Sequence, residues 1–307
     1  MHDALTMSGS RQSRPTGAGV VLSGDADAVD ALRAAVEDRL GRGDVALPLL
    51  PQVASQVLSL ASDPTADAAR LSALIHRDPA LAAHVLRVAN SPAYMPRMPI
   101  VSLQQAVARL GLDTVTEIAL VASLRGGTFK VAGYERELEL LWRHAVASSL
   151  FAKEIARVRR SNVEAAFLGG LLHAVGKPAV LQLVASVEVV AVGAAQAACR
   201  AAVPALLDEL HVGVGLRIAE RWSLPRAVAS AIAHHVLYAD AGAFKHEAMI
   251  TCLADRLATA LCEPARFDDA TLVAHEVFAD LNLYPDDVAS LLGKRARVAE
   301  LVASMTA

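Results

Sequence analysis

Histidine and aspartate side chains recur along the second half of this sequence on segments that read as amphipathic helices. A metal site in a helical bundle takes its ligands from facing helices in this way. Imidazole nitrogens together with a carboxylate suit zinc, iron or manganese. An isolated histidine on an apolar helix is also explained as a satisfied core residue, so spacing alone leaves both interpretations open. The residues concerned are His144, His173, His211, His234, His235 and Asp255.

The stretch "GGLLHAVGK" at 169–177 shows the question most clearly. It holds His173 on an apolar segment, followed directly by the small residue Ala174. Lys177 closes the stretch, and Arg221 lies further along the chain. Both cations could contact phosphate if this region binds a nucleotide.

Three local patterns resemble catalytic motifs but lack a required residue. "IHRDP" at 75–79 contains the His-Arg-Asp of a kinase catalytic loop, but Ala83 stands where the metal-binding asparagine belongs. "HEAMI" at 246–250 begins like a zinc-protease motif, but Ile250 replaces its second histidine. "GVG" at 213–215 has neither the lysine nor the hydroxyl of a phosphate loop. We therefore assign none of these chemistries.

Composition indicates a helical protein of the soluble class. Of the 307 residues 54% are hydrophobic but only 4% are aromatic, and alanine and leucine favour helices. The net charge of −3 argues against a dedicated nucleic-acid binder. No uninterrupted apolar run approaches the roughly 18 residues of a membrane helix, and three cysteines without metal or disulfide spacing suggest reduced thiols. We expect an all-α, cytoplasmic protein that does not contact a membrane.

Helix signals divide the chain into two blocks. Residues 26–40 form a first amphipathic helix, and Asp67, Asp78 before Pro79, and Ser102 with Gln105 predict helix N-termini. Further capping boxes are predicted at Thr114 with Glu117 and at Ser161 with Glu164. The Gly-containing stretch "LRGGTFKVAGYE" predicts a boundary near residue 125.

One ordered series of motifs resembles the HD superfamily, metal-dependent phosphohydrolases named for an adjacent His-Asp pair. The series is His144, "HAVGK" at 173–177, His211, the pair His234 and His235, and Asp255. The front half, with "LPLLPQVASQVLSLASDP", "LSALIHRDPALAAHVLRVANSPAY" and "SLQQAVARLGLDTVTEIALVASL", is similar to the HDOD domain, an output domain of bacterial signalling proteins. The resemblance implies a helical subdomain at 45–125 packed on an HD-like subdomain at 126–240. Residues 241–307 would complete the HD-like part. A helix at 26–44 and a disordered tail at 1–25 precede them.

The resemblance also implies two sets of metal ligands. Counterparts of His144, His173 and Asp255 hold one metal in two-metal members of the superfamily, and counterparts of His211, His234 and His235 hold the other. The bridging aspartate has its counterpart at Ala174. Two divalent cations about 4 Å apart repel, and a shared carboxylate screens and positions them. A standard two-metal centre is therefore not expected, while a single site with three protein ligands stays possible.

Three functions follow as hypotheses. The first is a bacterial regulatory protein, without catalysis or cofactor, that binds a protein partner in signalling, often beside cyclic-di-GMP modules in this family. The second is a phosphohydrolase or phosphodiesterase that keeps one divalent Zn, Fe or Mn ion. The third is a sensor that binds a nucleotide such as a cyclic dinucleotide without turnover, using Lys177 and Arg221.

Overall fold

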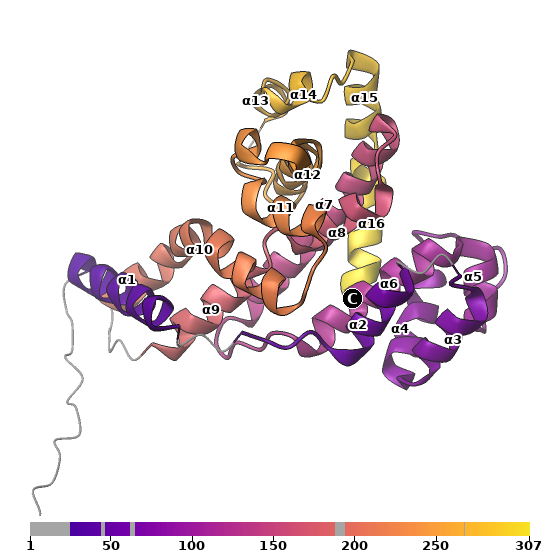
Figure 1. Cartoon of the computed structure of the whole chain (residues 1–307), viewed down its shortest axis with the longest axis horizontal. Coiled ribbons are helices and arrows are strands. Elements are labelled where there is room, and N and C mark those ends of the chain that lie inside the picture. Colours follow the sequence, from indigo (N-terminus) through magenta and orange to yellow (C-terminus); the bar gives the residue numbers. More distant parts are fainter. Residues whose placement is uncertain (1–24, 44–46, 62–64, 188–193, 267) are drawn as a thin grey trace, which may run out of the picture.

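The chain is described by a computed structural model that covers residues 25–43, 47–61, 65–187, 194–266 and 268–307 (Figure 1). Over these ranges it consists of α-helices, two short 3-10 helices and connecting turns, with no strand, which confirms the all-α prediction. The tail predicted at 1–25 lies outside the described residues apart from Asp25, which begins the first helix. The helices are α1 Asp25–Arg42, α2 Gln52–Ala61, α3 Ala68–His76, α4 Pro79–Ala89, α5 Leu103–Leu110, α6 Leu112–Gly127, α7 Glu135–Arg159, α8 Val163–Leu172, α9 Gly176–Ser186, α10 Ala194–Arg221, α11 Arg226–His234, η1 Tyr238–Asp240, η2 Gly242–Phe244, α12 Lys245–Cys262, α13 Asp269–Val273, α14 Val277–Asp280, α15 Pro285–Gly293 and α16 Arg295–Thr306.

Helices α2 to α6 form a bundle at one end of the molecule (Figure 1). Its helix starts follow from local chemistry, because the side chains of Asp67, Asp78 and Ser102 accept hydrogen bonds from backbone N–H groups of the first turn. The capping box at Ser102 is formed in part: Gln105 accepts a hydrogen bond from the N–H of Val101 rather than from that of Ser102.

Two of the predicted capping boxes are wrong. Helix α6 begins at Leu112, two residues before Thr114, because Gly111 with φ of +88° ends the preceding helix and starts the next. At the second position Asn162, not Ser161, accepts the hydrogen bond from the N–H of Ala165 that begins α8. In each case a neighbouring residue with suitable backbone geometry takes the role.

The second block is built around the long helix α7, which packs against α8 and α12, and α11 packs against both of these. Close helix crossings depend on glycine. A Cβ atom added at Gly170 would lie 2.7 Å from the carbonyl oxygen of Ser148, and one added at Gly176 would lie 2.0 Å from that of His211. The glycines of "GGLLHAVGK" therefore bring α7 and α10 close to the segment that carries His173.

A buried ion pair joins the two blocks. Glu117 on α6 accepts hydrogen bonds of 2.5 and 2.6 Å from Lys153 on α7, whose side chain is 9% exposed. Burial raises the pKa of Glu117 against the opposing effect of Lys153. Helix α16 also spans the junction, because it packs on both α6 and α7. The C-terminal helices thus contact both blocks.

Helix α1 packs on α10 and α9 rather than on the front bundle (Figure 1). The described residues directly before α2, at 47–51, include Pro48, whose carbonyl accepts a 2.9 Å hydrogen bond from the indole N–H of Trp222 on the α10 side. The first helix is therefore part of the second block in space.

One stretch of the described residues, Val163–Ser186, is long and apolar enough to cross a membrane by composition. Of its most apolar window 72% is buried inside the protein, and the stretch is interrupted by turns at 173–175. This is typical of a core segment of a soluble protein. The three cysteines are free thiols, and burial raises the pKa of Cys252 to about 11.

Candidate metal centre

Three of the predicted ligands meet around one carboxylate oxygen. His144 comes from α7, His173 from the turn after α8, and Asp255 from α12. Asp255 Oδ1 lies 2.8 Å from His144 Nε2 and 3.2 Å from His173 Nε2. The ligand atoms of these three residues all lie within 4.8 Å of one another. They come from positions far apart in sequence, so the fold builds this cluster.

Backbone contacts orient His173. Its Nδ1 lies 2.8 Å from the carbonyl oxygen of Gly170, which can only accept, so Nδ1 carries a proton. Nε2 donates to Asp255 Oδ1 when it is protonated as well, and its lone pair is available to a metal when it is not. Nε2 then faces Asp255 and His144, and such a backbone partner is the usual device that fixes the tautomer of a metal-ligating histidine. Burial raises the pKa of Asp255, but hydrogen bonds from His144 and His173 outweigh it and hold this pKa well below its usual value. The acid is ionised at neutral pH.

His211 and His235 form a second pair beside the first group. Their Nε2 atoms lie 3.2 Å apart, and the His235 ring centroid is 4.9 Å from that of His173. Each Nδ1 faces backbone carbonyls, those of Leu207 and Asp208 for His211 and those of Ala231 and Ile232 for His235. Both Nε2 atoms are therefore acceptors when the rings are neutral.

Charge on this pair is disfavoured. Burial, with the charge of Lys177, lowers the pKa of His211 to about 4, and burial, with the charge of His173, lowers that of His235 to about 3. At pH 7 two lone pairs then face each other with no proton between them. A shared cation would satisfy them, but this pair has no carboxylate.

The structure does not bring His234 into either group. It is the last residue of α11, is half-buried, and belongs to no three-ligand cluster among the described residues. Ala174, the counterpart of the bridging acid, lines an adjacent apolar cavity. The second set predicted from the resemblance thus lacks both its third histidine and the shared carboxylate.

The two predicted phosphate contacts are separated. Lys177 on α9 lies beside His211 and donates a 2.6 Å hydrogen bond to Asp208. Arg221 is exposed at the C-terminal end of α10, ten residues beyond His211, or roughly 15 Å along the helix axis. A phosphate beside the histidines would therefore reach Lys177 only in competition with Asp208, and would not reach Arg221.

The residues fit one divalent cation. Two histidines and one carboxylate with converging atoms make a three-ligand set that leaves an open position. His144, His173 and Asp255 would hold the ion, which when bound would polarise an oxygen or lower the pKa of a water. Two histidine ligands alone, at His211 and His235, are fewer than such a site ordinarily needs.

Sequence comparison decides the family. The HDOD domain family matches residues 47–237. This chain belongs to the HDOD domain family. Asp255 lies beyond the matched residues, so the HDOD segment and the C-terminal helices build the centre together. An uncharacterized protein from Treponema pallidum (strain Nichols) is 26% identical over 211 residues, which is 66% of this chain and 39% of that protein. The chain thus spans about two fifths of that relative's length.

Solved structures share the HDOD architecture. An HDOD domain protein of unknown function from Geobacter sulfurreducens is 22% identical with a TM-score of 0.64, covering 90% of this chain and 98% of that one. A candidate phosphohydrolase from Shewanella amazonensis SB2B is 22% identical, with a TM-score of 0.64 and coverages of 89% and 97%. A candidate signal transduction protein from Marinobacter aquaeolei VT8 is 24% identical, with a TM-score of 0.63 and coverages of 92% and 66%. These likenesses show the fold.

Sequence reasoning missed two groups that shape the site. The first is Asp208, which pairs with Lys177. Its position three residues before His211 on the same helix could have indicated that it lies near the site. The cavity beside Ala174 is lined by both tryptophans of the chain, which are 80 positions apart in sequence, and no local pattern predicts that they meet.

Proposed function

We propose that this chain is a regulatory component of a signalling pathway that acts by binding a protein partner, and that its HD-like centre holds no more than one divalent cation. The observation that carries the proposal is that one carboxylate serves the whole histidine cluster among the described residues. Asp255 is its acidic side chain, and the oxygen nearest the histidines already contacts both His144 and His173. Membership of a signalling output family and the likeness to a candidate signal transduction protein support the same conclusion.

A surface suited to a partner lies on the loop between α4 and α5. Met95, Met98 and Val101 expose 76%, 76% and 72% of their area there. Large apolar side chains gathered on one surface segment mark interaction sites. These three exposed residues on a single loop support our proposal that the partner binds there.

The loop is held in a fixed shape. The Asn90 side-chain amide donates to the Ile100 carbonyl and accepts from its N–H, each at 2.8 Å. The Arg297 guanidinium of α16 stacks on the Tyr94 ring at 5.5 Å from its centroid. Because the loop is ordered before binding, a partner loses less entropy in ordering it.

The test combines capture and activity. The full chain is immobilised beside a Met95→Ser/Met98→Ser variant and a control, Tyr284→Ser, which removes an equally exposed apolar side chain elsewhere. We expect specific partners to be retained by the wild type and the control and lost from the loop variant. Identical retention by all three, together with manganese-dependent phosphodiester hydrolysis, would contradict the proposal.

A second candidate function is favoured by the completeness of the first ligand set. His144, His173 and Asp255 could support metal-dependent phosphohydrolase activity with one cation. Hydrolysis of bis(p-nitrophenyl) phosphate with added manganese, abolished in Asp255→Asn but kept in the loop variant, would favour this function over the first.

A further inference from the structure

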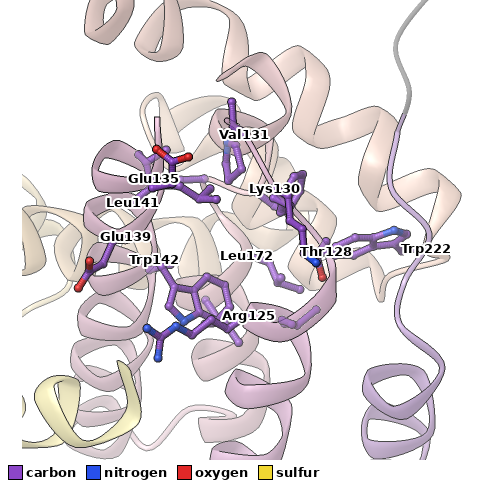
Figure 2. Close-up of a pocket in the computed structure, with 18 of the residues that line it drawn as sticks. Arg125, Thr128, Lys130, Val131, Glu135, Glu139, Leu141, Trp142, Leu172 and Trp222 are labelled. Carbon is purple, nitrogen blue, oxygen red and sulfur yellow. The ribbon is translucent and has the colours of Figure 1, made fainter. Parts of the chain in front are cut away.

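A cavity of about 540 Å³ lies beside the histidine cluster, between α7, the turn before α9 and the connection from α6 to α7 (Figure 2). Its walls are mainly apolar and include Leu138, Leu141, Leu172 and Val175. This volume and lining are typical of pockets that bind small molecules. The cavity is separate in chemistry from the histidine centre, because none of the clustered histidines lines it.

Two polar atoms in its wall are buried without a hydrogen-bond partner. They are Thr128 Oγ1, on a residue that is 7% exposed, and Trp142 Nε1. A buried polar group left unpaired costs about 1–3 kcal/mol, so such groups in a native protein require an explanation. An indole N–H can only donate, so Trp142 requires an acceptor oxygen.

The other tryptophan of the wall shows the contrast. Trp222 donates its N–H to the Pro48 carbonyl at 2.9 Å, so its ring contributes only an apolar surface to the cavity. Figure 2 shows the two indoles on opposite sides of the space. The unmet hydrogen-bonding capacity is therefore confined to Trp142 and Thr128.

Charged side chains also line the cavity. Lys130 is exposed beside Thr128 and makes no ion pair within the described ranges, while Arg125 donates to the Ala307 carbonyl at 3.1 Å. Glu135 and Glu139 line it from α7, and Glu135 accepts a hydrogen bond from the N–H of Gly133. Lys130 stands next to the unpaired hydroxyl, which favours an anionic or strongly accepting group at that point.

We propose that this cavity binds an amphipathic small molecule with an apolar body and an acceptor oxygen at one end, of the class of medium-chain carboxylates. The apolar body lies against the leucine and valine side chains, and the head group accepts a hydrogen bond from Thr128 Oγ1 beside Lys130, on the side of the space away from Trp142 (Figure 2). The proposal is independent of metal binding and of any protein partner, so it can fail or succeed without them.

Both tryptophans of the chain line the cavity, so intrinsic fluorescence reports its occupancy. The full chain is titrated with decanoate and, as a matched probe without an acceptor oxygen, with decyltrimethylammonium. We expect saturable 1:1 binding of decanoate and at least tenfold weaker binding of the cation. Absence of saturable decanoate binding, or equal binding of the two probes, would overturn the proposal.

Matched variants locate the binding by calorimetry. Thr128→Val removes the hydroxyl that meets the head group and should weaken decanoate binding roughly tenfold. Trp222→Phe removes an indole N–H that is already satisfied elsewhere and should weaken it far less. Leu141→Trp fills the cavity and should abolish binding, with circular dichroism confirming that the variant is folded. A folded Leu141→Trp variant that binds decanoate like the wild type would overturn the assignment to this cavity.

Discussion

The two halves of the histidine cluster have similar side chains but different chemistry. In one half His144 and His173 share the carboxylate of Asp255. In the other His211 and His235 face only each other and backbone carbonyls. The negative charge of a carboxylate stabilises a bound cation, whereas two buried neutral imidazoles offer lone pairs but no opposite charge. One acid residue therefore separates a complete ligand set from an incomplete one.

The largest expected effect comes from removing that acid. Asp255→Asn keeps the shape but removes the charge that both histidines contact, and it should lower the affinity for Zn²⁺ or Mn²⁺ by a hundredfold or more, about 3 kcal/mol. His211→Gln, in the other half, should change the affinity less than tenfold. Isothermal titration of the metal-free proteins measures both. Equal losses in the two variants would mean that the halves act as one site.

The packing beneath the histidine-only half is tested by Gly176→Ala. The new methyl group would lie 2.0 Å from the carbonyl oxygen of His211, so the helices must separate. We expect the free energy of unfolding to fall by about 1–3 kcal/mol, as for overpacked cores. Gly213→Ala on the same helix as His211 meets no atom within 4 Å and should be neutral or slightly stabilising. Urea denaturation compares them, and equal effects would rule out this packing role.

Acid should destabilise the metal-free protein through the histidine-only half. The pKa of His211 is lowered to about 4 and that of His235 to about 3 in the folded state, against about 6.5 when unfolded. The unfolded state binds more protons in this window, so stability is complete above pH 6.5 and is lost as the pH falls toward 4. His211→Gln/His235→Gln should flatten this dependence between pH 6.5 and 4. A wild-type melting temperature unchanged over that range would contradict the assignment.

The smallest effect is expected from Lys177→Met. It removes a positive charge beside His211 and its surface ion pair with Asp208. Exposed pairs contribute about 0–1 kcal/mol, so stability should change little while the pKa of His211 rises slightly. NMR titration of the histidine ring protons measures this shift. A fall in the pKa of His211 would show that the charge of Lys177 does not act on this half.

Helical periodicity and capping residues allowed the all-α fold to be predicted, together with helix starts at Asp67, Asp78 and Ser102. Thr114 was misassigned because Gly111 has a left-handed backbone that begins α6 earlier. The grouping of His144, His173 and Asp255 followed from the family resemblance, and the structure brings these residues together. The place of His234 could not be predicted, because adjacent histidines point in different directions and the packing of α11 selects His235. The cavity is lined by Trp142 and Trp222, which lie 80 positions apart in the sequence, and no local pattern encodes their common place in its wall.

The most direct test is the number of cations bound by the wild-type protein. Calorimetric titration of the chelator-treated full chain with Mn²⁺ or Zn²⁺, checked by elemental analysis, gives this stoichiometry. The single shared carboxylate predicts one equivalent at most, lost in Asp255→Asn. Two equivalents bound to the wild type with comparable affinity would contradict the account, because the histidine-only half would then hold a cation without an acid.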